Sequence, residues 1–234
     1  MALQHSPSIV TSGLVYCSDA ANLRSYPGTG TTLYDLSGNG YTGSMYAGVS
    51  YSSSNLGSLA YNGTTTAVTY IGTSTRYLST SMSVEAWVKS TGLGSGMSAG
   101  GIFGITYGFI VNLNANGSLG YYMYNTDSGS AVSLMSADST GVNFFNNSWH
   151  HLVCTKYPSG YAMYVDGVLN TSGSTGSWSG TNIWVAMETC LGLNPNNNVY
   201  YLSGSMGPAR IYNIALTAAQ VSQNYNALRG RYGV

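Results

Sequence analysis

Charged residues are scarce in this chain of 234 residues. Lys, Arg, Asp and Glu together make up 6% of the sequence, against about 25% in an ordinary soluble domain. The formal net charge is zero, and a nucleic-acid-binding protein needs a basic surface. Nucleic-acid binding is therefore excluded as the main activity. The surface has to consist mainly of Ser, Thr, Asn, Gly and part of the 21 tyrosines.

Long apolar runs and an export signal are also missing. No run approaches the ~20 residues that a membrane-spanning helix needs, so we expect no membrane span. Residues 1–13 (MALQHSPSIVTSG) lack the basic and apolar regions of a secretory signal. Cys17, Cys154 and Cys190 are odd in number and far apart. These features predict reduced thiols in a protein made in a cytoplasm without a signal peptide.

What is present is a series of short strand patterns separated by glycine-rich turns. Asn-Gly and Asp-Gly pairs such as Asp166-Gly167 are typical of tight hairpins. In residues 82–89 (MSVEAWVK), Val84 and Ala86 point to one side and Glu85 and Trp87 to the other. Helical crossovers are missing from the interior, which disfavours a parallel sheet. We therefore predict an all-β fold, a two-sheet antiparallel β-sandwich or jelly roll.

One helix is expected, at residues 217–230 (TAAQVSQNYNALRG). Thr217 and Gln220 have the spacing of a capping box, and Gly230 is expected to close the helix. The Ser/Gly-rich stretches 90–101 and 170–180 are expected to be loops. Residues 1–12 are predicted to form an N-terminal arm, and residues 13–234 a single domain.

The segment 147–167 (NSWHHLVCTKYPSGYAMYVDG) contains two adjacent histidines. Read as a strand, it places His151 on one face and His150 and Cys154 on the other. The two imidazoles then cannot chelate one ion, and a zinc site would need further ligands. A structural strand, followed by a turn at Pro158 and a returning strand, is the reading that we adopt.

Four stretches resemble a known family: residues 149–169 (WHHLVCTKYPSGYAMYVDGVL), 82–89, 207–221 (GPARIYNIALTAAQV) and 25–43 (SYPGTGTTLYDLSGNGYTG). Together they resemble the laminin-G-like domains of the concanavalin-A-like lectin/glucanase fold. The third stretch resembles the closing strand and short C-terminal helix of that family. The variant with residues 25–40 and the tail 224–234 looks most like domains found in bacteriophage structural proteins.

Enzyme activity of the related glucanases depends on two nearby carboxylates, one as acid/base and one as nucleophile. Here Glu85 and Glu188 have no acidic neighbours in the sequence. Glycoside hydrolysis is therefore disfavoured, and we expect no catalytic residue.

Two weak binding signals remain. Many laminin-G-like domains bind calcium, and Asp35, Ser37 and Asn39 stand at alternate positions of an oxygen-rich loop, with Asp35 and Asn39 as the candidate ligands. Tyr46 stands where the bidentate Glu would be expected. Asp35 could instead cap the local turn. Tyr122 and Tyr124 share one face of a strand pattern and could serve a glycan, a protein interface or the core. No cofactor is required, and calcium is the one candidate.

These observations lead to a main prediction and two alternatives. The main prediction is a non-enzymatic phage virion protein on the virion surface, which decorates the capsid exterior as a homo-oligomer. Its partners would be capsid or other virion proteins, contacted partly through residues 1–12. The first alternative is a glycan-binding adhesin or receptor-binding fibre module that recognises a host surface glycan. The second is a glycoside hydrolase.

Overall fold

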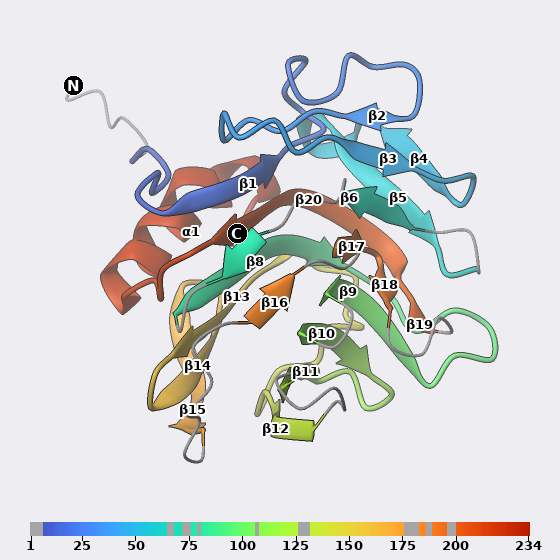
Figure 1. Ribbon diagram of the computed structural model, residues 1–234. Helices are drawn as coiled ribbons and strands as arrows, with labels where there is room; N and C mark the ends of the chain where they lie inside the picture. Colours follow the sequence, from blue (N-terminus) through green and yellow to red (C-terminus); the bar gives the residue numbers. More distant parts are fainter. Residues whose placement is uncertain are drawn as a thin grey trace, which may run out of the picture.

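Two antiparallel sheets packed face to face form a sandwich, with one helix against the outer side of the first sheet (Figure 1). The computed structural model describes residues 7–64, 68–71, 76–78, 81–105, 108–125, 132–175, 183–185, 189–195 and 200–234. The predicted all-β sandwich with one C-terminal helix is confirmed.

The first sheet has eight strands, and β8 and β20 lie at its centre. In spatial order they are β15 (Val168–Ser174), β14 (Gly160–Val165), β13 (His150–Tyr157), β8 (Met82–Lys89), β20 (Ser203–Tyr212), β5 (Ser58–Asn62) and β4 (Val49–Ser52), with β1 (Leu14–Ser18) also paired with β20. A 3-10 turn, Ser54–Leu56, connects β4 and β5.

The second sheet also has eight strands. In spatial order they are β12 (Val132–Asp138), β11 (Leu119–Asn125), β10 (Phe109–Asn114), β9 (Ala99–Ile105), β17 (Thr189–Leu191), β6 (Thr69–Ile71), β3 (Gly43–Met45) and β2 (Thr32–Leu33). Two small sheets pair β7 (Arg76–Leu78) with β16 (Ile183–Val185), and β18 (Leu193–Asn194) with β19 (Tyr200–Tyr201).

The core lies between the two large sheets. Val84 and Ala86 of β8 pack in one buried cluster with Val111, Leu113 and Tyr121 of the second sheet. Because side chains alternate along a strand, residues between these core positions point away from the core. Glu85 and Trp87 therefore face outward from the first sheet, and Asn112 and Tyr122 face outward from the second.

The segment with the two histidines folds as expected. Residues of β13 pair with β14 in register from Leu152↔Val165 to Tyr157↔Gly160. The turn between β14 and β15 has positive φ angles at both Asp166 (51°) and Gly167 (80°), as a type I′ hairpin requires.

The helix α1 (Ala218–Tyr232) begins with the predicted capping box of Thr217 and Gln220. The residue that closes the helix lies three positions later than predicted. Gly230 continues the helix, and Gly233 provides the left-handed C-cap, with φ 72° and ψ 29°. No helix in the described part of the chain is long and apolar enough to cross a membrane.

Two expected loops are partly strands. Residues 170–174 belong to β15, and Ala99 already starts β9. Both are glycine- and serine-rich stretches in which hydrogen bonding to a neighbouring strand outweighs low strand propensity.

At the N-terminus, residues 1–6 lie outside the described part. The backbone of the next residues contacts α1: Gln223 Nε2 donates to Ser8 O at 2.7 Å, and Val10 N donates to Asn224 Oδ1 at 2.7 Å. The division into an arm and a domain stays a prediction.

Candidate functional site

The outer face of the second sheet carries a polar groove with a volume of about 280 Å³. Such a volume is close to the lower end of the ~300–1,000 Å³ of small-molecule sites. Asn112 and Asn114 come from β10, and Tyr122 and Tyr124 from β11. The lining is completed by Ser98, Ala99, Asn194 and Tyr200.

The β18–β19 hairpin forms one wall of the groove because β9 is lined with glycine. A Cβ atom at Gly101 would overlap the Leu193–Asn194 backbone, and one at Gly104 would overlap Pro195. The absence of both side chains lets residues 193–195 lie directly on the sheet. This packing brings Asn194 and Tyr200 next to the strands β10 and β11.

Asn112 is the most informative residue of the groove. The residue is 5% exposed, and its Oδ1 atom has no hydrogen-bond partner among the residues that the structure describes. An unsatisfied buried acceptor costs about 1–3 kcal/mol of stability. A ligand in the groove that donates a hydrogen bond to Asn112 Oδ1 would remove this cost.

The neighbouring polar side chains are fixed by a hydrogen-bond chain. Tyr122 Oη donates to Asn114 Oδ1 at 3.2 Å, and Asn114 Nδ2 donates to Asp138 Oδ1 at 2.8 Å and to Ser118 Oγ at 3.0 Å. Burial and the nearby Asp138 carboxylate raise the pKa of Tyr122, so its hydroxyl stays protonated. The groove is thus partly preorganised before any ligand enters.

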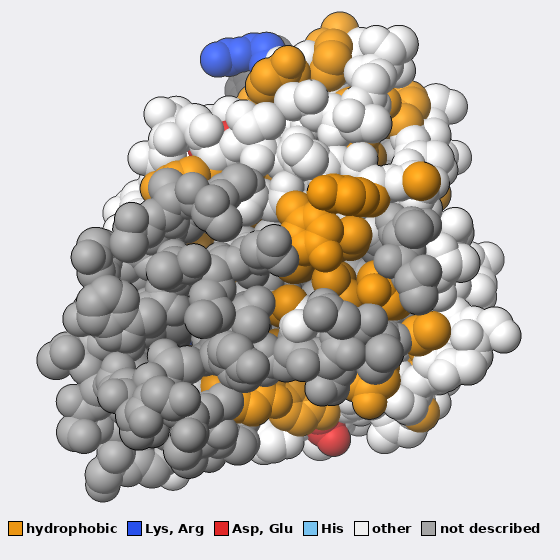
Figure 2. Space-filling model, turned by 45° about the vertical axis from the view of Figure 1, so that its right-hand side comes forward, with side chains coloured by type: hydrophobic (Ala, Val, Ile, Leu, Met, Phe, Trp, Pro, Cys, Tyr) orange, Lys and Arg blue, Asp and Glu red, His pale blue; other side chains and the backbone are white. Residues whose placement is uncertain are grey.

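Figure 2 shows the side of the molecule that includes the β18–β19 region of Figure 1. On this face the described hydrophobic side chains, among which tyrosines are counted, form a band, and few of the described side chains are charged. This surface suits contacts through hydrogen bonds and aromatic rings more than through ion pairs.

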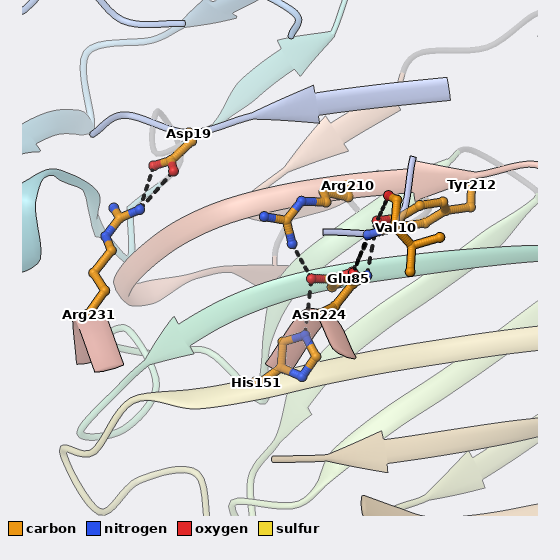
Figure 3. A network of polar contacts seen from close by, with 8 residues as sticks. All are labelled: Val10, Asp19, Glu85, His151, Arg210, Tyr212, Asn224 and Arg231. Carbon is orange, nitrogen blue, oxygen red and sulfur yellow. Dashed lines mark hydrogen bonds and ion pairs between the residues drawn. The ribbon is translucent and has the colours of Figure 1, made fainter. Parts of the chain in front are cut away.

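A second polar cluster lies under α1 (Figure 3). The Glu85 carboxylate contacts the Arg210 guanidinium, and His151 Nε2 lies 3.1 Å from Glu85 Oε1. Asn224 Nδ2 donates to Glu85 Oε2 at 2.6 Å, and Tyr212 Oη donates to Val10 O at 3.2 Å. This cluster joins β8, β13, β20, α1 and the N-terminal segment.

The buried charges under α1 stabilise one another. Burial alone raises the pKa of Glu85, but Arg210 and the contacts with His151 and Asn224 outweigh it and hold the pKa at about 2. The same carboxylate raises the pKa of Arg210, although burial acts in the opposite direction. Glu85, His151 and Asn224 have no exposed surface. The cluster is therefore a structural element that attaches α1, and it has no access to a substrate.

With the fold and the groove established, the family can be assigned. A family model described as the concanavalin A-like lectin/glucanases superfamily, of the laminin-G type, matches residues 62–222. The chain belongs to this family. A comparison with curated proteins finds no significant sequence match.

Solved structures of similar fold include binding domains of bacterial toxins. The binding domain of Paraclostridial Mosquitocidal Protein 1 has a TM-score of 0.70 at 15% identity, over 92% of this chain and 52% of that one. The botulinum neurotoxin serotype D ligand-binding domain, in complex with N-acetylneuraminic acid, has a TM-score of 0.66 at 11% identity, over 92% and 51%. This laminin-G-like chain spans about half the length of these toxin domains.

A third similar structure matches over nearly its whole length. Domain 4 of AbnA, an extracellular arabinanase from Geobacillus stearothermophilus in complex with arabinotriose, has a TM-score of 0.63 at 17% identity, over 92% of this chain and 98% of that one. At these identities, the likeness establishes the fold alone.

Of the residues singled out in the sequence, Tyr122 and Tyr124 are brought together in the groove. Their role in binding stays a prediction. Asn112 and Asn114 were missed. The signal was present in residues 109–114 (FIVNLN), where two amides alternate with Val111 and Leu113 on an otherwise apolar strand.

The two histidines point to opposite sides of β13, as predicted. His150 Nδ1 lies 2.8 Å from Asp166 Oδ2, and His151 lies against Glu85 on the other face. Cys17, Cys154 and Cys190 are buried, and no disulfide joins any two of them in the structure; their reduced state stays a prediction.

Asp35 caps its own loop. Its Oδ1 atom accepts hydrogen bonds from Cys17 N at 2.9 Å and Ser37 N at 2.8 Å, and its Oδ2 atom accepts one from Ser37 Oγ at 2.6 Å. Asn39 Nδ2 donates to Val15 O at 2.9 Å. Within the described ranges, no three His, Cys, Asp or Glu side chains gather as metal ligands. Calcium binding stays a prediction. Glu188, the second glutamate considered in the sequence, lies outside the described residues.

Proposed function

We propose that the protein is a non-enzymatic carbohydrate-binding module that holds a sugar in the groove on β10 and β11. The observation that carries this proposal is the buried, unpartnered Oδ1 atom of Asn112 at the groove. A sugar hydroxyl is a donor of the right kind for this atom. Protein surfaces rarely keep such an acceptor unless a ligand or water uses it.

The tyrosines of the groove suit the apolar face of a sugar ring. Each sugar ring has an apolar face of C–H groups, which packs on aromatic rings. Tyr122, Tyr124 and Tyr200 line the groove and are each partly exposed. Tyrosine offers a large apolar surface together with a polar hydroxyl, and the combination with asparagine amides suits a polyhydroxylated ring.

The carboxylates of the described residues support binding without hydrolysis. Glycosidases place two carboxyl groups about 5–9.5 Å apart across the scissile bond. Asp138 hydrogen-bonds to a groove residue, but Glu85 is enclosed under α1 on the other sheet. The groove therefore lacks an acid/base pair among the residues that the structure describes.

The structural neighbours favour this proposal over capsid decoration. They include binding domains of toxins and a domain solved in complex with arabinotriose. The glycan-binding alternative thus becomes the main reading. A virion location, capsid partners and a homo-oligomer remain predictions, and co-sedimentation with undecorated capsids would test them.

The test of the proposed function is the substitution Asn112→Leu, measured by glycan array and isothermal titration calorimetry. The native protein should bind a sugar saturably, and the variant should lose at least about tenfold in affinity because it loses a buried hydrogen bond. The melting temperature of the variant should be no lower than that of the native protein, since the substitution removes an unsatisfied buried acceptor.

A matched control is Tyr34→Ala, which removes a 47% exposed tyrosine that does not line the groove. It should bind as the native protein does. Unchanged affinity of the Asn112→Leu variant, or silence of the native protein on the array, would contradict the proposed function.

A further inference from the structure

We propose that the groove selects neutral sugars over acidic ones and that Asp138 is the residue that determines this selectivity. The inference rests on the proposed function, because it names the class of sugar that the same groove takes. It follows from the placement of the few charges and from the direction of the available hydrogen bonds.

The carboxylate of Asp138 is connected directly to the groove. Asp138 ends β12 and is exposed, and its Oδ1 atom accepts a hydrogen bond from Nδ2 of the groove residue Asn114 at 2.8 Å. It is also close enough to Tyr122 to raise the pKa of that hydroxyl. A negative charge that acts on a groove side chain also acts on a charged ligand beside it.

Basic residues are placed elsewhere. None of the seven lies on the strands that form the groove, β9–β12, β18 and β19: they are Arg24, Arg76, Lys89, Lys156, Arg210, Arg229 and Arg231. Residues 126–131 and 196–199, the chain segments adjacent to β11, β12 and β19 in sequence, also contain no Lys or Arg. A carboxylate or sulfate on a ligand would therefore meet a negative charge with no cation on these strands to balance it.

Hydrogen-bond direction leads to the same ligand class. Asn112 Oδ1 and the Asp138 carboxylate are both acceptors, and the Asn114 amide is already engaged by Tyr122, Ser118 and Asp138. These two acceptors take hydrogen-bond donors from a ligand, whereas the hydroxyls of Ser98, Tyr124 and Tyr200 in the lining can donate or accept. Neutral sugar hydroxyls donate, whereas an ionised carboxylate only accepts.

The shared fold does not imply a shared ligand. The botulinum neurotoxin serotype D domain was solved with N-acetylneuraminic acid, which is an acidic sugar. The charge beside the groove of the present chain leads us to expect the opposite preference.

The experiment compares native protein with Asp138→Asn and Asp138→Glu on an array of neutral oligosaccharides and their sialylated or uronic-acid counterparts. At low salt the native protein should prefer the neutral member of each pair by about tenfold, the size expected for two like charges separated by several ångströms in a partly solvated site. Salt should reduce this preference because it screens the repulsion.

The two variants separate charge from shape. Asp138→Asn keeps the acceptor for Asn114 but removes the charge, so affinity for the acidic sugars should rise to within about threefold of the neutral ones. The readout is the ratio of the affinities for the acidic and the neutral member of each pair, so a general change in binding strength that affects both members alike does not alter it. Asp138→Glu keeps the charge and should keep the preference for neutral sugars.

The outcomes also separate this inference from the proposed function. If the native protein binds acidic sugars as well as neutral ones, and Asn112→Leu abolishes both, the selectivity is overturned while the binding function stands. If Asp138→Asn leaves the preference unchanged, the assignment to Asp138 is overturned. A native protein that binds no sugar overturns the function and the selectivity together.

Discussion

The substitution Glu85→Gln tests the buried cluster under α1, and we expect it to lower the free energy of unfolding by about 3 kcal/mol at pH 7. The folded pKa of Glu85 is about 2, compared with an ordinary value of 4.5, and each unit corresponds to about 1.36 kcal/mol. Removing one partner of a buried ion pair costs about 3–5 kcal/mol, which agrees. The variant leaves the charge of Arg210 buried without its carboxylate.

The pH dependence gives an independent check of the same cluster. Because the pKa of Glu85 is lower in the folded than in the unfolded state, its contribution is present above about pH 4.5 and is lost as the pH falls toward 2. Urea unfolding of the native protein, followed by circular dichroism from pH 7 to pH 2.5, should therefore show a loss of stability in this window. The Glu85→Gln variant should show a flatter profile there.

A matched control and a double variant complete the test. Asp138→Asn changes the charge by the same amount at an exposed position, and it should alter the unfolding free energy by less than about 0.5 kcal/mol. Glu85→Gln combined with Arg210→Met should be less destabilised than the sum of the two single variants. A loss below about 1 kcal/mol for Glu85→Gln, or a pH profile parallel to the native one, would refute the ion-pair reasoning.

Two further predictions concern the N-terminal segment and the loop that contains Asp35. Deletion of residues 1–12 removes the buried Val10 side chain and its backbone hydrogen bonds to Asn224 and Tyr212. The free energy of unfolding, measured with urea, should fall by about 2 kcal/mol. Native stability of the truncated protein would contradict the role given to these contacts. Chelation with EDTA should leave the melting temperature unchanged, because the oxygens of Asp35 already accept hydrogen bonds from Ser37 of its own loop and from Cys17 of β1. A lower melting temperature after chelation would contradict this reasoning and indicate a structural metal ion.

The fold could be predicted from the sequence because its signals are local. The alternation in residues 82–89, the hairpin pair Asp166-Gly167 and the capping box at Thr217 each act over a few residues. The end of α1 was placed too early because Gly230 and Gly233 both follow the apolar pattern of the helix, and either could be its C-cap. Only the left-handed backbone at Gly233, with φ 72°, distinguishes them.

The groove and the buried cluster depend on contacts between distant segments. Glu85 and Arg210 are 125 residues apart, and Glu85 and Asn224 are 139 apart, so no local pattern joins them. Glu85 therefore read as an isolated carboxylate in the sequence. In the groove, the shared face of Tyr122 and Tyr124 was visible, but the wall built by residues 193–195 was not, because it depends on the glycines of β9.

The scarcity of charge determines how the protein can recognise a partner. Most of the described acidic residues have structural partners: Asp19 pairs with Arg231, Asp166 with His150, and Glu85 with Arg210. Asp138 differs, because its partner is a neutral amide that lines the groove. Long-range steering by a surface of zero net charge is weak, so affinity has to come from contacts made within the groove. A buried acceptor, fixed amides and tyrosine rings provide short-range contacts that depend little on salt. The charge of Asp138 beside them contributes to selectivity between ligands and little to the affinity for a neutral sugar.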